Sequence, residues 1–190
     1  MGLRIIGGDL KGKRLRSVSG TITRPTSDRL RESIFNILSF RVQATIALDL
    51  FAGTGAFGIE ALSRGAKYAI FIDIYKDALS IIEQNIRSCA LENRARIIQW
   101  DITRNLNCIS SFCSQIGLVF MDPPYNRSII KPTLLHLYNS RAVEKEACIV
   151  VEHSPLEPIQ PKDLQEDKSA FETMDQRKYG NTLISFLKYS

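Results

Sequence analysis

The apolar residues of this chain gather in short runs, separated by longer stretches in which apolar positions recur every three or four residues. Runs of about six mostly apolar residues, rich in Ile, Leu, Val and Phe, are typical of strands that are buried on both faces of a sheet. Such runs predict six strands, over residues 46–51, 68–73, 96–101, 117–122, 147–152 and 182–187.

The stretches around these strands predict helices. The first helix begins near Thr26 or Ser27, either of which is a good N-cap. Apolar residues recur at i, i+4, i+7 and i+8 from Leu30, so one face of this helix packs on a core. Arg29 and Arg31 lie off that stripe, and both are expected to reach solvent or a ligand. Further helices are predicted over residues 59–64, 76–90 and 129–138.

The alternation of strands and helices predicts an α/β fold with a mostly parallel central sheet and helices on both faces. Ligands on such sheets bind at the carboxyl ends of the strands. Four acids, Asp49, Asp73, Asp101 and Asp122, fall at or near the ends of separate predicted strands. One strand-end acid is routine, but four on one edge of a sheet predict a site.

The last of these acids opens the sequence Asp122-Pro123-Pro124-Tyr125. Proline fixes φ and has no N–H donor, so two prolines hold the chain extended and rigid. The Asp122 side chain and a fixed backbone carbonyl could then accept hydrogen bonds from a planar amino group, and Tyr125 could stack on the ring that carries it. The alternative is that the prolines merely end a strand and Asp122 caps a loop.

The N-terminal part of the chain is strongly basic. Residues 1–31 hold eight of the 25 Lys and Arg residues and only two acids, whereas the remainder is nearly neutral. Two short alternating segments, 3–6 and 13–18, flank a Gly-rich turn and predict a basic β-hairpin. We therefore expect an N-terminal hairpin extension over residues 1–23, a main domain over residues 24–190, and a polyanionic partner at the basic end.

Composition excludes several classes of protein. The 190 residues are 44% hydrophobic and 24% charged, as in ordinary globular proteins. The chain has no apolar run of membrane-spanning length and no recognisable signal peptide, which favours a cytoplasmic protein. Its four cysteines form no Cys-x-x-Cys pair, and the two histidines lie far from Cys108 and Cys113, so we expect reduced thiols and no metal site.

The glycines Gly53, Gly55 and Gly58 match the dinucleotide-binding pattern, and Asp73 lies 20 residues after the first of them. An NAD enzyme is therefore one interpretation. A pyrophosphate, however, binds best at a helix N-terminus with positive surroundings. Asp49 and Asp122 would crowd it with negative charge, whereas they suit the cationic cofactor S-adenosylmethionine, so this cofactor is the favoured interpretation. Chain length supports it too, because a dehydrogenase usually adds a substrate domain.

These motifs occur in the order found in Rossmann-like amino-methyltransferases, and the whole chain resembles the RsmD family of bacterial 16S ribosomal RNA guanine-N2 methyltransferases. The segments that carry the resemblance span nearly the full length: Arg4–Gly8 with Gly12-Lys13, Arg24-Pro25-Thr26 with Asp28–Asn36, Ala52–Arg64, Asp122–Tyr125 and Tyr179–Thr182. Two positions depart from the family pattern. Asp73 stands where glutamate is expected, and Tyr75 stands where aspartate is expected.

The resemblance implies the roles of specific residues. It implies catalysis by Asp122, Pro123, Pro124 and Tyr125. It implies contacts with S-adenosylmethionine from Asp49, Phe51, Gly53, Thr54, Gly55, Asp73 and Asp101. It implies contacts with RNA phosphates from Lys11, Lys13, Arg14, Arg24, Arg29 and Arg31. The implied partner is ribosomal RNA or the assembling small ribosomal subunit, and the protein is expected to be a monomer.

Three other functions stay open on the sequence. Asp-Pro-Pro-Tyr also occurs in DNA adenine-N6 methyltransferases, but this chain has no sizeable target-recognition segment. A catalytically silent module that binds RNA or the cofactor is disfavoured by the intact Asp122 and both prolines. The third is the NAD oxidoreductase described above.

Overall fold

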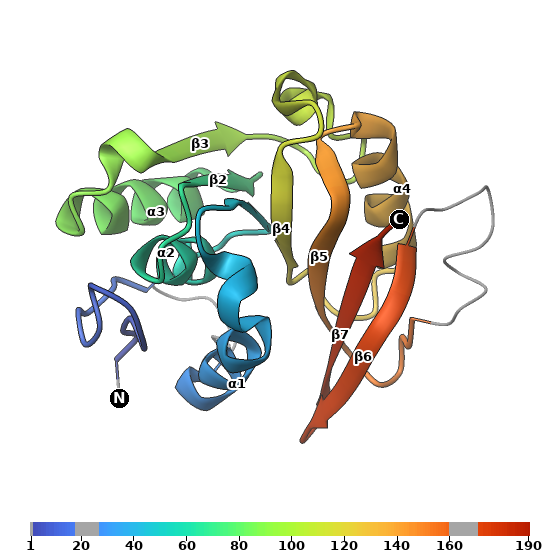
Figure 1. Cartoon of the computed structure of the whole chain (residues 1–190), viewed down its shortest axis with the longest axis horizontal. Coiled ribbons are helices and arrows are strands. Elements are labelled where there is room, and N and C mark those ends of the chain that lie inside the picture. Colours follow the sequence, from blue (N-terminus) through green and yellow to red (C-terminus); the bar gives the residue numbers. More distant parts are fainter. Residues whose placement is uncertain (1, 18–26, 160–170) are drawn as a thin grey trace.

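A computed structural model describes residues 2–17, 27–159 and 171–190 of the chain. Within these ranges, seven strands form one sheet in the order β3-β2-β1-β4-β5-β7-β6 (Figure 1). The first five strands are parallel, and β7 runs antiparallel to both β5 and β6. Their bounds are β1 (Ile46–Leu50), β2 (Tyr68–Asp73), β3 (Ala95–Gln99), β4 (Ile116–Met121), β5 (Val143–His153), β6 (Phe171–Tyr179) and β7 (Thr182–Tyr189).

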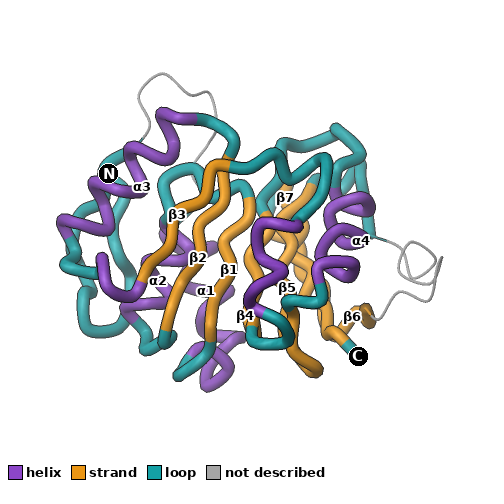
Figure 2. The backbone as a smooth tube through the Cα atoms, turned by 90° about the horizontal axis from the view of Figure 1, so that it is seen from above, coloured by secondary structure: helices purple, strands orange, loops and turns teal. Residues whose placement is uncertain are grey.

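Helices cover both faces of this sheet (Figure 2). The side chains of α1, α2 and α3 share one hydrophobic core with the sheet, and those of α4 share the second core on the opposite face. The predicted α/β fold is therefore confirmed. The helices are α1 (Asp28–Leu38), α2 (Ala56–Ser63), α3 (Lys76–Ser88) and α4 (Ile130–Ser140), with short 3₁₀ turns η1 (Ser39–Val42), η2 (Glu92–Arg94) and η3 (Asn107–Phe112).

The first helix begins where the sequence predicts. Ser27 is its N-cap, and the Ser27 hydroxyl accepts a hydrogen bond of 3.2 Å from the Leu30 backbone N–H. Phe35, which is buried next to the apolar stripe, lies against Phe120 of β4 with 5.4 Å between ring centroids, and Phe120 stacks on Phe57 of α2 at 4.9 Å. These rings fix α1 and α2 over the carboxyl half of β4.

The C-terminal part of the sheet differs from the prediction. Strand β5 begins four residues earlier than predicted, and β6 was not predicted at all. Most side chains of β6 are exposed because it is the last strand of the sheet, so its sequence, Phe-Glu-Thr-Met-Asp-Gln-Arg-Lys-Tyr, lacks the apolar run of a buried strand. The prediction failed there because an edge strand needs little hydrophobic surface.

Within residues 2–17 the N-terminal segment pairs with itself as predicted, through one isolated antiparallel bridge between Arg4 and Arg14. The Ile5 N–H donates to the Lys13 carbonyl at 2.9 Å, and both Ile5 and Leu15 are buried in the core beside α2. The segment is thus docked on the main domain. Residues 18–26 lie outside the described residues, so the predicted domain boundary after residue 23 stays a prediction.

One prediction about α1 is wrong. Arg31 does not reach solvent, because its side chain is only 1% exposed. Its guanidinium donates to the Arg4 carbonyl and to Asp28, and it faces the buried carboxylate of Glu60 on α2 at 3.9 Å. Burial lowers the pKa of Arg31, while Glu60 and Asp28 act in the opposite direction. Arg31 is therefore a structural cation that joins the N-terminal segment, α1 and α2.

Candidate active site

The loop between β1 and α2 lies at the carboxyl edge of the sheet and follows a tight path. Three of its residues have positive φ, namely Phe51 at 59°, Gly53 at 54° and Gly55 at 74°. Glycine adopts this conformation without strain. The Asp73 carboxylate, at the end of β2, accepts hydrogen bonds from the backbone N–H groups of Gly53 at 2.9 Å and Tyr75 at 3.0 Å. Asp73 therefore fixes the glycine loop, and the sequence had predicted that Asp73 and this loop belong to one site.

Asp49 is buried in β1 beneath the same loop. Its carboxylate accepts a hydrogen bond of 2.9 Å from the Gly58 backbone N–H in the first turns of α2. Burial raises the pKa of Asp49 to about 8, and the charge of Asp73 acts in the same direction. Any larger residue at position 58 would clash with the core, because a Cβ at this position would lie 2.3 Å from the Phe71 ring. The acid and the loop are thus packed as one unit.

A side chain that the sequence did not point to connects this loop to the basic N-terminal segment. Asn85 of α3 is 1% exposed, and its amide donates to the Thr54 carbonyl at 3.0 Å and to the Arg16 carbonyl at 3.1 Å. It also accepts from the Arg16 backbone N–H at 2.7 Å. Asn85 lies seven residues after Ala78 and three after Ile82, on the apolar face of α3, so its position in the helix was a signal that it is buried, whereas its partners carried none.

Asp101 follows β3 and has a different environment. Its carboxylate accepts hydrogen bonds from the backbone and the hydroxyl of Thr103, and it forms an ion pair of 3.1 Å with Arg104. The hydroxyl bond is the main reason why the pKa of Asp101 lies below its usual value. Asp101 is thus at the predicted edge, next to the strand that carries Asp73, but its carboxylate is occupied by its own turn.

Asp122 lies directly after β4 and is partly buried. Burial raises the pKa of Asp122 well above the usual carboxyl range, and the charges of Glu152 and Asp49 add to the effect. Pro123 is buried and Pro124 is exposed, which fits a rigid turn that leads the chain from the sheet to the surface. The structure therefore brings Asp122 into the electrostatic range of the acid beneath the glycine loop.

Tyr125 completes this edge of the sheet. Its ring is 39% exposed, and its hydroxyl donates to the Glu152 carboxylate at 3.0 Å and lies 3.3 Å from the Thr182 hydroxyl. Glu152 near the end of β5 and Thr182 at the start of β7 were not among the predicted site residues. Glu152 carried the same signal as the other acids, because it ends a predicted strand, and Thr182 belongs to the segment Tyr179–Thr182 that carries part of the family resemblance.

The six predicted RNA-binding residues differ in their exposure to solvent. Lys11, Arg14 and Arg29 are exposed, and Lys13 is half-buried. Arg24 lies outside the described residues, and Arg31 is buried. Asn85 holds the Arg16 backbone beside the glycine loop, whereas the turn at residues 7–10 is bonded to Ser63 at the carboxyl end of α2.

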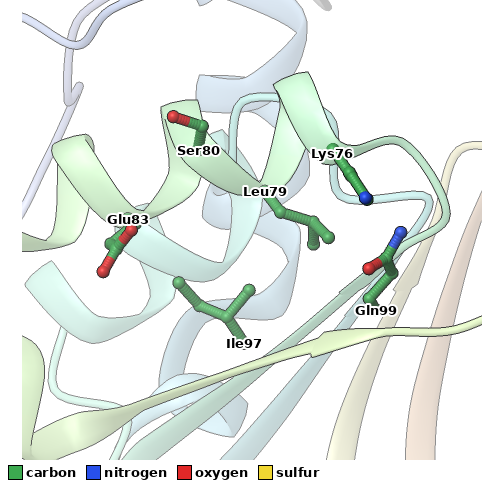
Figure 3. Close-up of a pocket in the computed structure, with 6 residues that line it drawn as sticks. All are labelled: Lys76, Leu79, Ser80, Glu83, Ile97 and Gln99. Atoms are coloured by element: carbon green, nitrogen blue, oxygen red, sulfur yellow. The ribbon is translucent and has the colours of Figure 1, made fainter.

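A shallow hollow lies elsewhere on the surface, between α3 and the edge strand β3 (Figure 3). Lys76 and Gln99 lie at one end of it and Glu83 at the other. The Gln99 amide donates to the Ile74 carbonyl at 3.1 Å, which steadies the turn after Asp73. None of the predicted site residues lines this hollow.

Two kinds of feature are absent from the part of the chain that the structure describes. No group of three or more His, Cys, Asp and Glu side chains is placed to hold a metal ion. No helix in residues 2–17, 27–159 and 171–190 is long and apolar enough to cross a membrane.

Solved structures with this fold assign the chain to the Rossmann-like class I methyltransferases. One of them, "Putative methyltransferase yhhF" from Escherichia coli, superposes with a TM-score of 0.80 at 29% identity, covering 100% of this chain and 99% of its own. The family model described as "Conserved hypothetical protein 95" matches residues 3–188. The chain belongs to this family, which confirms the resemblance to RsmD.

Two curated relatives are similar over most of the chain. "Putative rRNA methyltransferase YlbH" of Bacillus subtilis is 37% identical over 151 residues, which cover 80% of this chain and 82% of the relative. "Ribosomal RNA small subunit methyltransferase D" of Escherichia coli K12 is 36% identical over 154 residues, which cover 79% of this chain and 74% of the relative. The chain is thus a methyltransferase by family and by fold.

Proposed function

We propose that this enzyme transfers a methyl group from S-adenosylmethionine to the exocyclic N2 amine of one guanine in 16S ribosomal RNA. The names of its relatives support ribosomal RNA as the substrate class. The observation that carries the proposal is the position of Asp122. It follows β4, is held by two prolines, and interacts electrostatically with Asp49 beneath the glycine loop.

The loop and its acids fit a cationic cofactor. Asp49, Asp73 and Asp122 put three carboxylates around the carboxyl ends of β1, β2 and β4. At Gly53 an added Cβ would meet no atom closer than the Phe51 carbonyl at 3.9 Å, so space is open beside the loop. When bound, S-adenosylmethionine supplies a methyl group on a positively charged sulfur. A pyrophosphate would lie beside three acidic side chains here, which disfavours the NAD alternative.

The chain's own contribution to the reaction is electrostatic. The lone pair of the guanine N2 amine is delocalised into the ring, which makes the amine a poor nucleophile. Hydrogen bonds from N2 to the Asp122 carboxylate and the Pro123 carbonyl favour a tetrahedral nitrogen and stabilise the positive charge that develops on it. The rigid Pro123-Pro124 turn keeps these acceptors in place before the base arrives. Asp122 then takes the proton that N2 releases.

Tyr125 is suited to hold the base itself. Its hydroxyl is anchored between Glu152 and Thr182, and its ring is partly exposed. A ring fixed at one end and open on its face can stack on a base that is taken out of a helix or a loop. We expect the enzyme to act as a monomer in the cytoplasm, on ribosomal RNA or on the assembling small subunit.

The exposed cations of the N-terminal segment are expected to bind RNA phosphates. Replacing Lys11 and Arg14 together with alanine should lower the slope of log affinity against log salt concentration by about two, because each cation neutralises about one phosphate. Cofactor affinity should not change. The measurement is RNA binding at several salt concentrations. A matched double variant at exposed lysines near the amino ends of the strands, Lys67→Ala with Lys145→Ala, should keep the wild-type slope.

Cofactor binding should depend on the protonation of Asp49. Because the pKa of Asp49 in the free protein is about 8, its carboxyl is mostly neutral at pH 7, and a bound cation favours the ionised form. Affinity should therefore rise with pH, by about tenfold per unit for one released proton, until the pH exceeds this pKa. For the variant Asp49→Asn, the slope of log cofactor affinity against pH should be lower by about one, because this variant releases one proton fewer. Calorimetric titrations at several pH values measure both slopes. Equal slopes for the two proteins would contradict the assigned pKa.

The proposed function is tested by incubating the enzyme with labelled S-adenosylmethionine and unmodified small ribosomal subunits, followed by digestion of the RNA to nucleosides. Recovery of the label as N2-methylguanosine is the expected result. Label in another nucleoside would overturn the acceptor atom, and unlabelled RNA from an enzyme that binds the cofactor would overturn the substrate.

A further inference from the structure

The turn between β6 and β7, residues Tyr179–Thr182, is one of the segments that resemble the RsmD family. Gly180 and Asn181 are its two central residues, and Gly180 has a positive φ of 59°. Two-residue hairpin turns favour glycine at the first central position for this reason. The flanking residues Tyr179 and Thr182 are opposite each other in the antiparallel pair, so both side chains lie on one face of the sheet. The tight turn therefore holds these two side chains in a fixed relation.

Both ends of this turn are tied to distant parts of the chain. The Tyr179 hydroxyl lies 2.6 Å from the Ser33 hydroxyl of α1, and the Tyr179 ring packs against the core that α1 shares with the sheet. The Thr182 hydroxyl lies 3.3 Å from the Tyr125 hydroxyl. Because the Tyr125 hydroxyl donates to the Glu152 carboxylate, its oxygen accepts from the Thr182 hydroxyl. In Figure 1, α1 and the turn lie beside each other at the lower end of the molecule.

These contacts join two exposed segments to one buried support. The inward face of α1 is buried in the core, which makes this helix a rigid reference. The turn ends an edge strand whose side chains are mostly exposed, and both of its central residues are exposed. Residues 124–128, which include Tyr125, are exposed as well. Segments with few buried contacts open most easily, so the position of the Tyr125 ring depends on its ties to the rest of the fold.

We propose that the β6–β7 turn positions the Tyr125 ring for stacking on the substrate base, and that Ser33 and Tyr179 are positioning residues because they fix this turn to α1. The inference rests on the proposed function and adds to it the element that orients the ring. A misplaced ring holds the base away from the methyl group and slows transfer. These side chains carry no charge, whereas affinity for RNA rests mainly on phosphate contacts. Their loss should therefore lower kcat and leave the KM for RNA unchanged.

The first test removes the contact between the turn and the ring. Thr182→Val loses the hydroxyl but keeps a β-branched side chain, and it should lower kcat for methylation of the small ribosomal subunit by about fivefold, the effect of one lost hydrogen bond. Thr182→Ser keeps the hydroxyl and should restore kcat to within about twofold of wild type. The matched control is Thr173→Val, at an exposed position of β6, which should leave kcat unchanged.

The second test removes the contact between the turn and α1. Ser33→Ala should also lower kcat by about fivefold, although the Ser33 hydroxyl bonds to Tyr179 and not to the ring that stacks on the base. Cofactor affinity should not change. The matched control is Ser80→Ala, at an exposed position of α3 where the hydroxyl accepts a hydrogen bond from Gln84, and it should keep the wild-type kcat.

The same substitutions in a Tyr125→Phe background separate positioning from a general loss of structure. Phenylalanine lacks the hydroxyl that the turn holds, so Thr182→Val and Ser33→Ala should each change kcat by less than about twofold there. A fivefold loss that persists in this background would overturn the inference, and so would a Ser33→Ala variant with wild-type kcat or with a raised KM for RNA. Those results leave the proposed function standing, whereas a wild-type enzyme that does not methylate guanine at N2 refutes the proposed function itself.

Discussion

Replacing Asp122 with alanine should lower kcat for N2-methylation by about a thousandfold while the protein stays folded. Removing one preorganised group that stabilises transition-state charge typically has an effect of this size. Folding should suffer little, because burial and the charges of Glu152 and Asp49 already disfavour the ionised Asp122 carboxylate. Asp122 belongs to neither hydrophobic core, so its loss removes no core packing.

Single-turnover methylation with saturating cofactor measures the loss of the methyl-transfer rate, and urea unfolding measures the change in the free energy of unfolding. Asp122→Asn is a useful second variant, since it keeps the shape and one acceptor but loses the charge, and it should fall between alanine and wild type. Asp77→Ala, at an exposed position in the first turn of α3, should retain full activity. Activity of Asp122→Ala within about tenfold of wild type would refute the proposed mechanism.

Replacing Glu60 with alanine should destabilise the protein by about 3–5 kcal/mol, the usual cost of removing one partner from a buried ion pair. Glu60 is 1% exposed, accepts hydrogen bonds from the Ile6 and Gly7 backbone N–H groups at 2.7 and 2.8 Å, and pairs with Arg64 at 2.7 Å. Its removal also takes away one of the two carboxylates beside the buried Arg31.

Urea unfolding of the variant gives the free energy directly. The matched control is Glu83→Ala on α3, which removes an i,i+4 ion pair with Arg87 of the same length, 2.7 Å, at an exposed position. Solvent screens that pair, so the control should change the free energy of unfolding by less than about 0.5 kcal/mol. Similar losses in the two variants would mean that the buried network contributes no more than a surface pair.

The sequence predicted the residues at the end of each parallel strand well, because hydrophobic runs locate strands and parallel topology then brings their ends to one edge. Asp49, Asp73 and Asp122 follow from this reasoning alone. The same signal was present at Glu152, but its hydrogen bond with the Tyr125 hydroxyl joins residues 27 positions apart and could not be predicted from the strand pattern.

Long-range polar contacts could not be predicted from the sequence. Arg31 looked like a surface cation because periodicity gives the direction of a side chain on its own helix, not what packs over it. The N-terminal segment covers this side chain, since its guanidinium donates to the Arg4 carbonyl 27 positions earlier in the chain. Asn85 was missed for the same reason, because its partners Arg16 and Thr54 come from two other segments.

The charged strand β6 affects the tendency of the protein to aggregate through the edge of its sheet. The last strand of a sheet presents unpaired backbone groups to which a strand of another chain can add. Here that border carries acidic and basic side chains at Glu172, Asp175, Arg177 and Lys178, and its pairing with β7 is interrupted by an irregularity between Thr173 and Asp175. Charge and a local bulge both discourage strand addition, so β6 protects the sheet against aggregation through this border.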